Sequence, residues 1–231
     1  MIETKQQVAK IVKRWRENLS KPDWYLHLEK DIRDYFLKSP ESEIEKRIRW
    51  AIYDFVESAL ENEQIGLGNE GINWDIERKP IRFVVIHHSG TNPDISISRL
   101  SGMGLLRLYA PIYLNKKDYP EAFGQSIYSN HWKDNHQVFY AYHWLIRQDG
   151  TVERLLEDHH IGWHAGNWAV NCASIGICLA GNYSTKRPTF SMLESIKKIL
   201  NSYSRVKVIP HCAIKKQTKC PGSWFNHTKL R

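Results

Sequence analysis

The residues best suited to chemistry lie at the ends of predicted strands. Five mostly β-branched and aromatic residues, 82–86, lead into His87 and His88 and then into a Ser-Gly-Thr turn. This pattern is typical of a buried strand that ends in two imidazoles. Another short apolar run leads to His211, and Cys220 follows nine residues later. Side chains at strand ends are held by the sheet but face the loops, so they can reach a ligand.

Two imidazoles and one thiol would together form a set of metal ligands. Three such ligands leave a fourth position open, as a catalytic zinc site requires. His211 and Cys220 share one loop, and His87 would join them from the end of another strand. From the residues alone the alternative stays open, because a single His or Cys is more often an ordinary buried residue than a ligand. His88 points to the opposite face of its strand and is not expected to share the role of His87.

The elements around these residues divide into two regions. Residues 1–65 predict a module of three amphipathic helices, the last with Ser39 as its N-cap and Pro40 at its first helical position. Glycines and asparagines interrupt the pattern at 66–78, which predicts a linker. We interpret the helices as a structural or accessory module, with a binding surface as the alternative.

Residues 79–231 predict an α/β domain with a central mixed sheet flanked by helices. The expected elements are a strand at 82–86, a helix within 96–109, strands at 138–146, 152–156 and 174–181, a helix capped by Thr189, and a strand at 206–209. A tight hairpin turn is expected at 148–151. The sheet would therefore bring together residues that lie far apart in the sequence.

Composition narrows the classes of protein. The chain has 231 residues, 42% of them hydrophobic, and no apolar run long enough to span a membrane. The formal net charge is +8, with a net charge of −2 in residues 1–80 and +10 in residues 81–231. The basic part fits a nucleic acid, an anionic membrane, an acidic wall polymer or simply a basic surface. No nucleic-acid motif accompanies the charge, so a nucleic-acid partner is disfavoured.

No signal peptide is visible, so we expect cytoplasmic synthesis, with release to a cell wall as one route to a substrate.

Five motifs occur together and in order over about residues 80–225, and this chain resembles the zinc-dependent N-acetylmuramoyl-L-alanine amidase family. That family includes phage lysozymes of the amidase type and the peptidoglycan recognition proteins. The motifs are His87-His88-Ser89-Gly90-Thr91, Tyr142-His143-Trp144-Leu145-Ile146 with Asp149-Gly150-Thr151, Gly162-Trp163-His164-Ala165-Gly166, Asn171 through Ser174-Ile175-Gly176-Ile177 to Gly181-Asn182, and His211 through Cys220-Pro221-Gly222.

The resemblance implies hydrolysis of the amide between N-acetylmuramic acid and L-alanine in peptidoglycan. It implies one zinc ion per chain, bound by His87, His211 and Cys220. It also implies catalytic roles for Tyr142, against the alternative of an ordinary strand aromatic, and for Thr218, against an ordinary loop residue. The spacing of nine residues is one longer than usual in the family, so Lys216 or Lys219 could replace Thr218 in that position.

Three further residues are substrate-binding candidates by the same resemblance, namely Trp163, His164 and Asn171. His164 would contact substrate or carry a proton to the leaving amine, with a structural role as its alternative. We expect a monomer that acts on peptidoglycan or muropeptides, with no membrane insertion.

The ligand Cys220 bears on the biological role. Relatives that recycle wall fragments in the cytoplasm tend to have aspartate in its place, so a lytic or remodelling role is favoured over recycling. Non-catalytic recognition of peptidoglycan is the other alternative.

Overall fold

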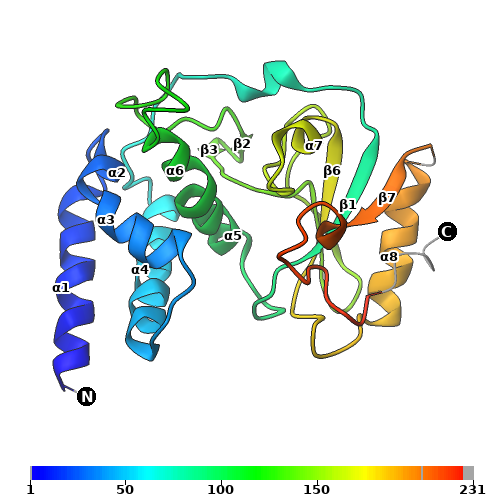
Figure 1. The fold of residues 1–231 in the computed structure, drawn as a ribbon, viewed down its shortest axis with the longest axis horizontal. Coiled ribbons are helices and arrows are strands. Elements are labelled where there is room, and N and C mark those ends of the chain that lie inside the picture. The colour runs from blue at the N-terminus through cyan, green and yellow to red at the C-terminus, as the bar shows by residue number, and fades with distance from the viewer. Residues whose placement is uncertain (1, 204, 226–231) are drawn as a thin grey trace. The chain divides into compact units, whose positions relative to one another are not determined.

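The computed structural model describes residues 2–203 and 205–225, and the chain forms two compact units (Figure 1). The helical unit contains Met1–Asn73 and Ile97–Phe139, and the sheet unit contains Trp74–Ser96 and Tyr140–Arg231. The chain therefore passes between the two units three times.

The N-terminal part of the helical unit is built around two long helices. Its elements are α1 (Ile2–Asn18), α2 (Trp24–His27), α3 (Glu29–Ile32), the π-helix η1 (Arg33–Leu37) and α4 (Glu43–Glu61). Aromatic rings fill the space between them, and Trp15 lies 6.2 Å from Trp24 and 5.9 Å from Phe36 between ring centroids. The predicted helical module is present.

The start of α4 differs from the prediction, because its N-cap is Ser42 and not Ser39. The Ser42 hydroxyl accepts a hydrogen bond from the Glu45 amide at 3.2 Å, and the Glu45 carboxylate accepts one from the Ser42 amide at 2.9 Å. This reciprocal capping box satisfies two amides that the helix cannot. Pro40 therefore lies before the helix.

The segment Ile97–Phe139 belongs to the helical unit, although the sequence placed it in the domain 79–231. It contains α5 (Ile97–Gly104), the π-helix η3 (Leu105–Tyr109), α6 (Ala110–Tyr113) and a hairpin of β2 (Trp132–Lys133) and β3 (His136–Gln137). The Arg99 guanidinium bonds the Glu57 carboxylate of α4 at 2.6 Å, and Tyr113 packs edge-on against Tyr25 at 5.9 Å. These long-range contacts have no signature in the local sequence.

The expected linker at 66–78 is also divided between the units. The Gly66 amide donates to Leu19 O at 2.8 Å and the Gly68 amide donates to Ile127 O at 2.9 Å, which fixes this stretch to the helical unit. Trp74–Glu77 forms the short 3₁₀ helix η2 of the sheet unit. Because Gly66 and Gly68 have no side chain, their backbone can pack closely against the neighbouring segments, and here they do not make the stretch a flexible linker.

The sheet unit is organised on five strands in the order β5-β4-β6-β1-β7. They are β1 (Phe83–His88), β4 (Trp144–Ile146), β5 (Val152–Arg154), β6 (Ser174–Leu179) and β7 (Lys207–Pro210). β1 pairs in parallel with β6 and β7, β4 is parallel to β6, and β5 is antiparallel to β4. The predicted strand 138–146 is too long, because β4 begins only at Trp144 and the residues up to Phe139 belong to the helical unit.

One face of this sheet is covered by α8 (Phe190–Asn201), whose N-cap is Thr189 as predicted (Figure 1). Apolar residues of β1, β4 and β6 pack against α8 in a buried core. Three short helices, η2, α7 (Trp168–Cys172) and η4 (His211–Ala213), complete the unit. The predicted α/β class, with a mixed sheet, flanking helices and an N-terminal helical module, is confirmed. Among the described helices, none has the length and apolar character to cross a bilayer.

Candidate active site

His87 lies near the end of β1, on the face of the sheet that is turned away from α8. Its register partner on β6 is Cys178, and both side chains are buried. The next residue, His88, points the other way, and its Nδ1 accepts a hydrogen bond from the Tyr183 amide at 3.0 Å. The two adjacent imidazoles therefore serve different faces, as the alternation of a strand predicted.

His211 and Cys220 approach His87 from the loop after β7. The loop closes on itself, because the Cys212 amide donates to Cys220 O at 2.8 Å. The Cys220 sulfur lies 3.7 Å from His87 Nδ1, and the His87 and His211 ring centroids are 4.5 Å apart. One ligand atom from each of the three predicted metal ligands lies within 4.8 Å of the others.

The outer nitrogens of the two imidazoles have partners that orient the rings. His211 Nε2 lies 3.2 Å from Ala165 O, and since a carbonyl only accepts, this nitrogen carries the proton. His87 Nε2 lies 3.0 Å from His164 Nδ1. In both rings Nδ1 is then the nitrogen left for a ligand, and such outer hydrogen bonds are the usual support of metal-binding histidines.

Burial sets the charge state of these groups in the absence of a cation. It lowers the pKa of His87 well below the ordinary value, with the neighbouring His164 and His211 adding to the effect. Burial also raises the pKa of the Cys220 thiol to about 12. The site thus offers neutral imidazoles, while a divalent cation would favour the thiolate. Two neutral imidazoles and one thiol fit zinc by type and by number.

Tyr142 lies beside this cluster on the segment before β4. Its ring centroid is 5.1 Å from that of His87, and its side chain is half-buried. Its side chain also faces the Cys178 thiol, whose pKa burial raises and the Tyr142 hydroxyl lowers. A phenol at this place can donate a hydrogen bond to an oxygen bound next to the cluster.

Thr218 lies two residues before Cys220 and is half-buried. Its hydroxyl oxygen accepts a hydrogen bond from the Cys220 amide at 3.1 Å, so the side chain shapes the ligand loop. The hydroxyl proton remains as a donor. The neighbouring alternatives, Lys216 and Lys219, are exposed. The catalytic role predicted for Thr218 stays a prediction.

His164 is buried, and both of its ring nitrogens are occupied. Nδ1 faces His87 and Nε2 lies 3.2 Å from the Ser174 hydroxyl. Gly176 of β6 makes room for the ring, because a Cβ there would lie 2.7 Å from a His164 ring carbon. This geometry favours the structural alternative, in which His164 positions His87, over the predicted contact with substrate.

Trp163 and Asn171, the other predicted substrate contacts, are also buried. The Trp163 ring packs edge-on against Trp74 and Trp168, both with centroids 5.7 Å away. The Asn171 side-chain oxygen accepts a hydrogen bond from the Ala165 amide at 2.8 Å. Both residues therefore stabilise the segment that carries His164 and Ala165, and their proposed contact with substrate is not favoured by this geometry.

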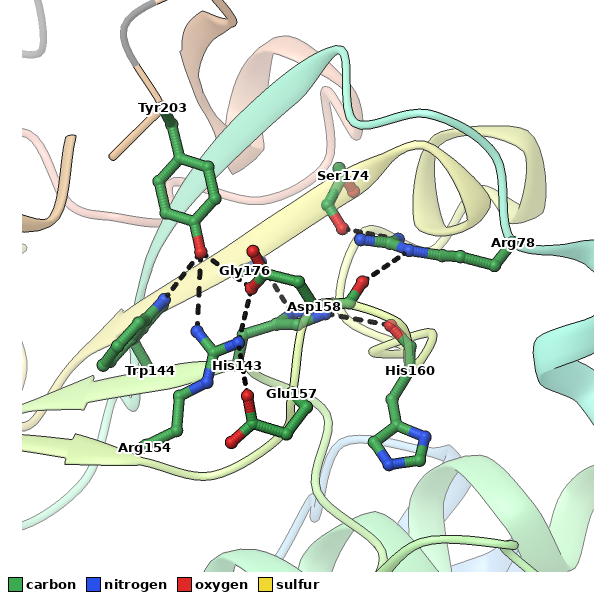
Figure 2. A network of polar contacts seen from close by, with 10 residues as sticks. All are labelled: Arg78, His143, Trp144, Arg154, Glu157, Asp158, His160, Ser174, Gly176 and Tyr203. Atoms are coloured by element: carbon green, nitrogen blue, oxygen red, sulfur yellow. Dashed lines mark hydrogen bonds and ion pairs between the residues drawn. The ribbon is translucent and has the colours of Figure 1, made fainter. Parts of the chain in front are cut away.

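Figure 2 shows a polar network that the sequence did not suggest. The Arg78 guanidinium donates to four backbone carbonyls at 2.9–3.2 Å, which belong to Asp158, Asn171, Cys172 and Ser174. It thereby fixes the loop before His160 to the start of β6. No local pattern marks this arginine, because its partners are main-chain atoms from distant segments.

His143 connects that network to the sheet (Figure 2). Its Nε2 donates to His160 O at 3.1 Å and its Nδ1 accepts from the Gly176 amide at 3.0 Å. Nearby, the Tyr203 hydroxyl donates to the Asp158 carboxylate at 2.7 Å, and Arg154 bonds the same carboxylate. These contacts secure the strand that begins just after Tyr142.

Comparisons with known proteins identify a family and several similar proteins. Residues 77–223 match the family model described as N-acetylmuramoyl-L-alanine amidase. Peptidoglycan-recognition protein 2 of Holotrichia diomphalia is 26% identical over 126 residues, which is 53% of this chain and 54% of that protein. The match therefore spans about half the length of that relative.

Similar solved structures come from a bacterium and from an insect. The endolysin N-acetylmuramoyl-L-alanine amidase LysCS of Clostridium intestinale is 22% identical, with a TM-score of 0.46 over 70% of this chain and 90% of that one. Peptidoglycan recognition protein SD of Drosophila is 19% identical, with a TM-score of 0.42 over 66% of this chain and 80% of that one.

Proposed function

The chain belongs to the N-acetylmuramoyl-L-alanine amidase family, and from this premise we propose that it hydrolyses the amide between N-acetylmuramic acid and L-alanine in peptidoglycan. The observation that carries the proposal is the cluster of His87, His211 and Cys220, with ligand atoms within 4.8 Å of one another. We propose that these residues hold one zinc ion. When bound there, zinc would supply Lewis-acid chemistry that activates water and polarises the amide carbonyl.

The protein's own groups would stabilise the charge that develops during hydrolysis. The Tyr142 ring centroid lies 5.1 Å from that of His87, and its hydroxyl can donate a hydrogen bond to the carbonyl oxygen as that oxygen becomes negative. The Thr218 hydroxyl is a second candidate donor. His164 would keep the Nε2 proton of His87 in place, so that Nδ1 stays available to the metal.

A complete ligand set beside a tyrosine supports catalysis over recognition without catalysis. A chain that only recognised peptidoglycan would need neither a buried thiol at 3.7 Å from an imidazole nitrogen nor the hydrogen bonds that orient both rings. The thiol ligand supports wall lysis or remodelling as the role, with recycling of soluble fragments as the alternative. Comparing rates on intact wall and on soluble muropeptides separates these two roles.

The test is release of L-alanine amino termini from purified wall, with the zinc content of each protein measured in parallel. Cys220→Ala should lose zinc and nearly all activity. Tyr142→Phe should keep zinc and lose activity by about 100-fold, as expected for removal of one donor to a developing oxyanion. Cys172→Ala, a buried free cysteine outside the cluster, is the matched control and should keep both.

Two results would contradict the proposal. If Cys220→Ala released amino termini at the wild-type rate, the cluster would not be the active site. If the wild type bound intact wall but released none, with zinc present, the chain would be a recognition protein.

A further inference from the structure

A concave site lies entirely within the helical unit, between the end of α4 and the β2–β3 hairpin. The pocket has a volume of about 270 Å³. Its floor is apolar, with Leu60, Ile65 and Leu67, and its rim carries Trp132, Asn69 and Asn135. Nothing in the proposed amidase chemistry uses these residues.

The rim combines an aromatic ring with side-chain amides, which are the groups that bind a neutral polar ring such as a sugar. The Trp132 side chain is 50% exposed. Exposing the apolar surface of an indole to water is unfavourable, and a ligand that stacks on the ring would remove part of this surface from water. Asn69 and Asn135 are exposed, and their side-chain amides have no hydrogen-bond partner among the residues that the structure describes. Each amide offers both a donor and an acceptor, which is the pairing that hydroxyl and acetamido groups need.

The pocket is held in shape from behind. The Gln137 side chain accepts from the Ser129 amide at 2.6 Å and donates to Gly68 O at 3.0 Å, which ties the hairpin to the segment after α4. At the rim, His136 Nδ1 lies 3.0 Å from a Glu63 carboxylate oxygen. A site with fixed walls loses less conformational entropy when a ligand binds.

Charge and size favour a sugar over other ligands. The helical unit contains 17 Lys and Arg against 17 Asp and Glu, so its net charge is zero, whereas the sheet unit carries the whole +8. A polyanion would therefore be drawn to the sheet unit and not to this pocket. A pocket below the usual range of about 300–1,000 Å³ for drug-sized ligands suits one small ring better than a folded peptide.

We propose that this pocket binds an N-acetylhexosamine unit of a glycan strand, with the apolar face of the pyranose on Trp132 and its polar groups on Asn69 and Asn135. The wall glycan would be the natural source of that sugar, and in this respect alone the inference rests on the proposed function. The helical unit would then hold the glycan while the sheet unit acts on the stem peptide.

The test uses triacetylchitotriose, a soluble β-linked trimer of N-acetylglucosamine that contains no muramoyl-alanine amide. Binding to the full chain is measured by calorimetry and by tryptophan fluorescence. We expect saturable binding to the wild type, at least tenfold weaker binding to Trp132→Ala, and several-fold weaker binding to Asn135→Ala. Trp50→Ala removes another exposed tryptophan of the helical unit, 46% exposed and outside the pocket, and should bind as the wild type does.

Each outcome bears on the assignment separately from catalysis. Wild-type binding that Trp132→Ala retains, or no binding of the trimer at all, would overturn the proposal even if the chain cleaves wall. Binding of a free stem peptide that depends on Trp132, without binding of the trimer, would overturn the sugar assignment. Trp132→Ala should still hydrolyse a small soluble muramoyl-alanine amide at the wild-type rate, which shows that the variant is folded.

Discussion

The two faces of the sheet in the sheet unit differ in almost every physical respect, although they share the same strands. On β6, Ile175, Ile177 and Leu179 face α8 and pack into an apolar core. The alternate residues Ser174 and Gly176 face the cluster, where the first bonds His164 and the second leaves space for its ring. One face is stabilised by the area it removes from water, and the other by hydrogen bonds made in fixed directions.

This difference shows how the site is maintained. A buried imidazole without a partner destabilises the fold, so each ring on the polar face is bound at both nitrogens or directed at the cluster. The apolar face needs no such direction, because hydrophobic packing depends on volume and shape. Substitutions on the first face should therefore affect metal binding, and substitutions on the second should affect stability.

The largest expected effect comes from the apolar face. Ile177→Ala leaves a cavity at a fully buried position, which should lower the free energy of unfolding by about 2–5 kcal/mol. Urea unfolding measures this loss, and zinc affinity below the transition should match the wild type. Val152→Ala, at an exposed edge-strand position, is the control and should change stability by about 0.5 kcal/mol or less. A large loss of zinc affinity in the folded Ile177→Ala protein would contradict the separation of the faces.

The adjacent residue tests the polar face. In Gly176→Ala the new methyl group would meet the His164 ring at 2.7 Å, so the ring must move away from His87 Nε2. Losing such support typically weakens metal affinity by about 10–100-fold. Competition with a zinc chelator measures the affinity, and His88→Gln, on the opposite face, should leave it unchanged. Equal affinities for Gly176→Ala and wild type would show that His164 does not position His87.

The smallest expected effect is a dependence of stability on pH. Burial lowers the pKa of His143 well below its ordinary value of 6.5, and the nearby His164 and Arg78 add to the effect. The unfolded chain takes up a proton below about pH 6.5 that the folded chain rejects, so stability present above that pH is lost as the pH falls. The contribution to the slope is up to about 1.4 kcal/mol per pH unit.

Urea unfolding of the metal-free protein between neutral and acid pH measures this slope. Glutamine does not titrate, so His143→Gln should lower the difference in bound protons between the unfolded and folded states by about one. The slope of stability against pH should fall in proportion. His159→Gln removes an exposed histidine of the same unit and should leave the slope as it is. If His143→Gln had the wild-type slope, the buried imidazole would not be a source of acid sensitivity.

Much of the architecture could be read from local pattern. The run of β-branched and aromatic residues before His87 predicted the buried strand. The opposite directions of His87 and His88 followed from the side-chain period of two in a strand. Thr189 was identified as the cap of α8 because its hydroxyl replaces a missing backbone partner. The predicted start of α4 was wrong because Ser39, followed by Pro40, also has the pattern of an N-cap. In the structure the N-cap is Ser42, which forms a capping box with Glu45.

The ordered motifs nominated the cluster, but its support came only from the fold. Arg78 bonds carbonyls from residues about 80 to 96 positions away, and such main-chain partners leave no trace in a sequence. His164 was nominated as a substrate contact because exposure cannot be read from a motif, whereas its two hydrogen bonds place it behind His87.

The sequence by itself determined which residues have the chemistry for a metal site and which strands carry them, because residue type and periodicity are local properties. The tertiary structure decided which of those residues meet and which only support the others. It also decided that Ile97–Phe139 joins the helical unit, and so created the pocket at Trp132. These features depend on contacts between distant segments, whose free energy is gained only when the chain has folded.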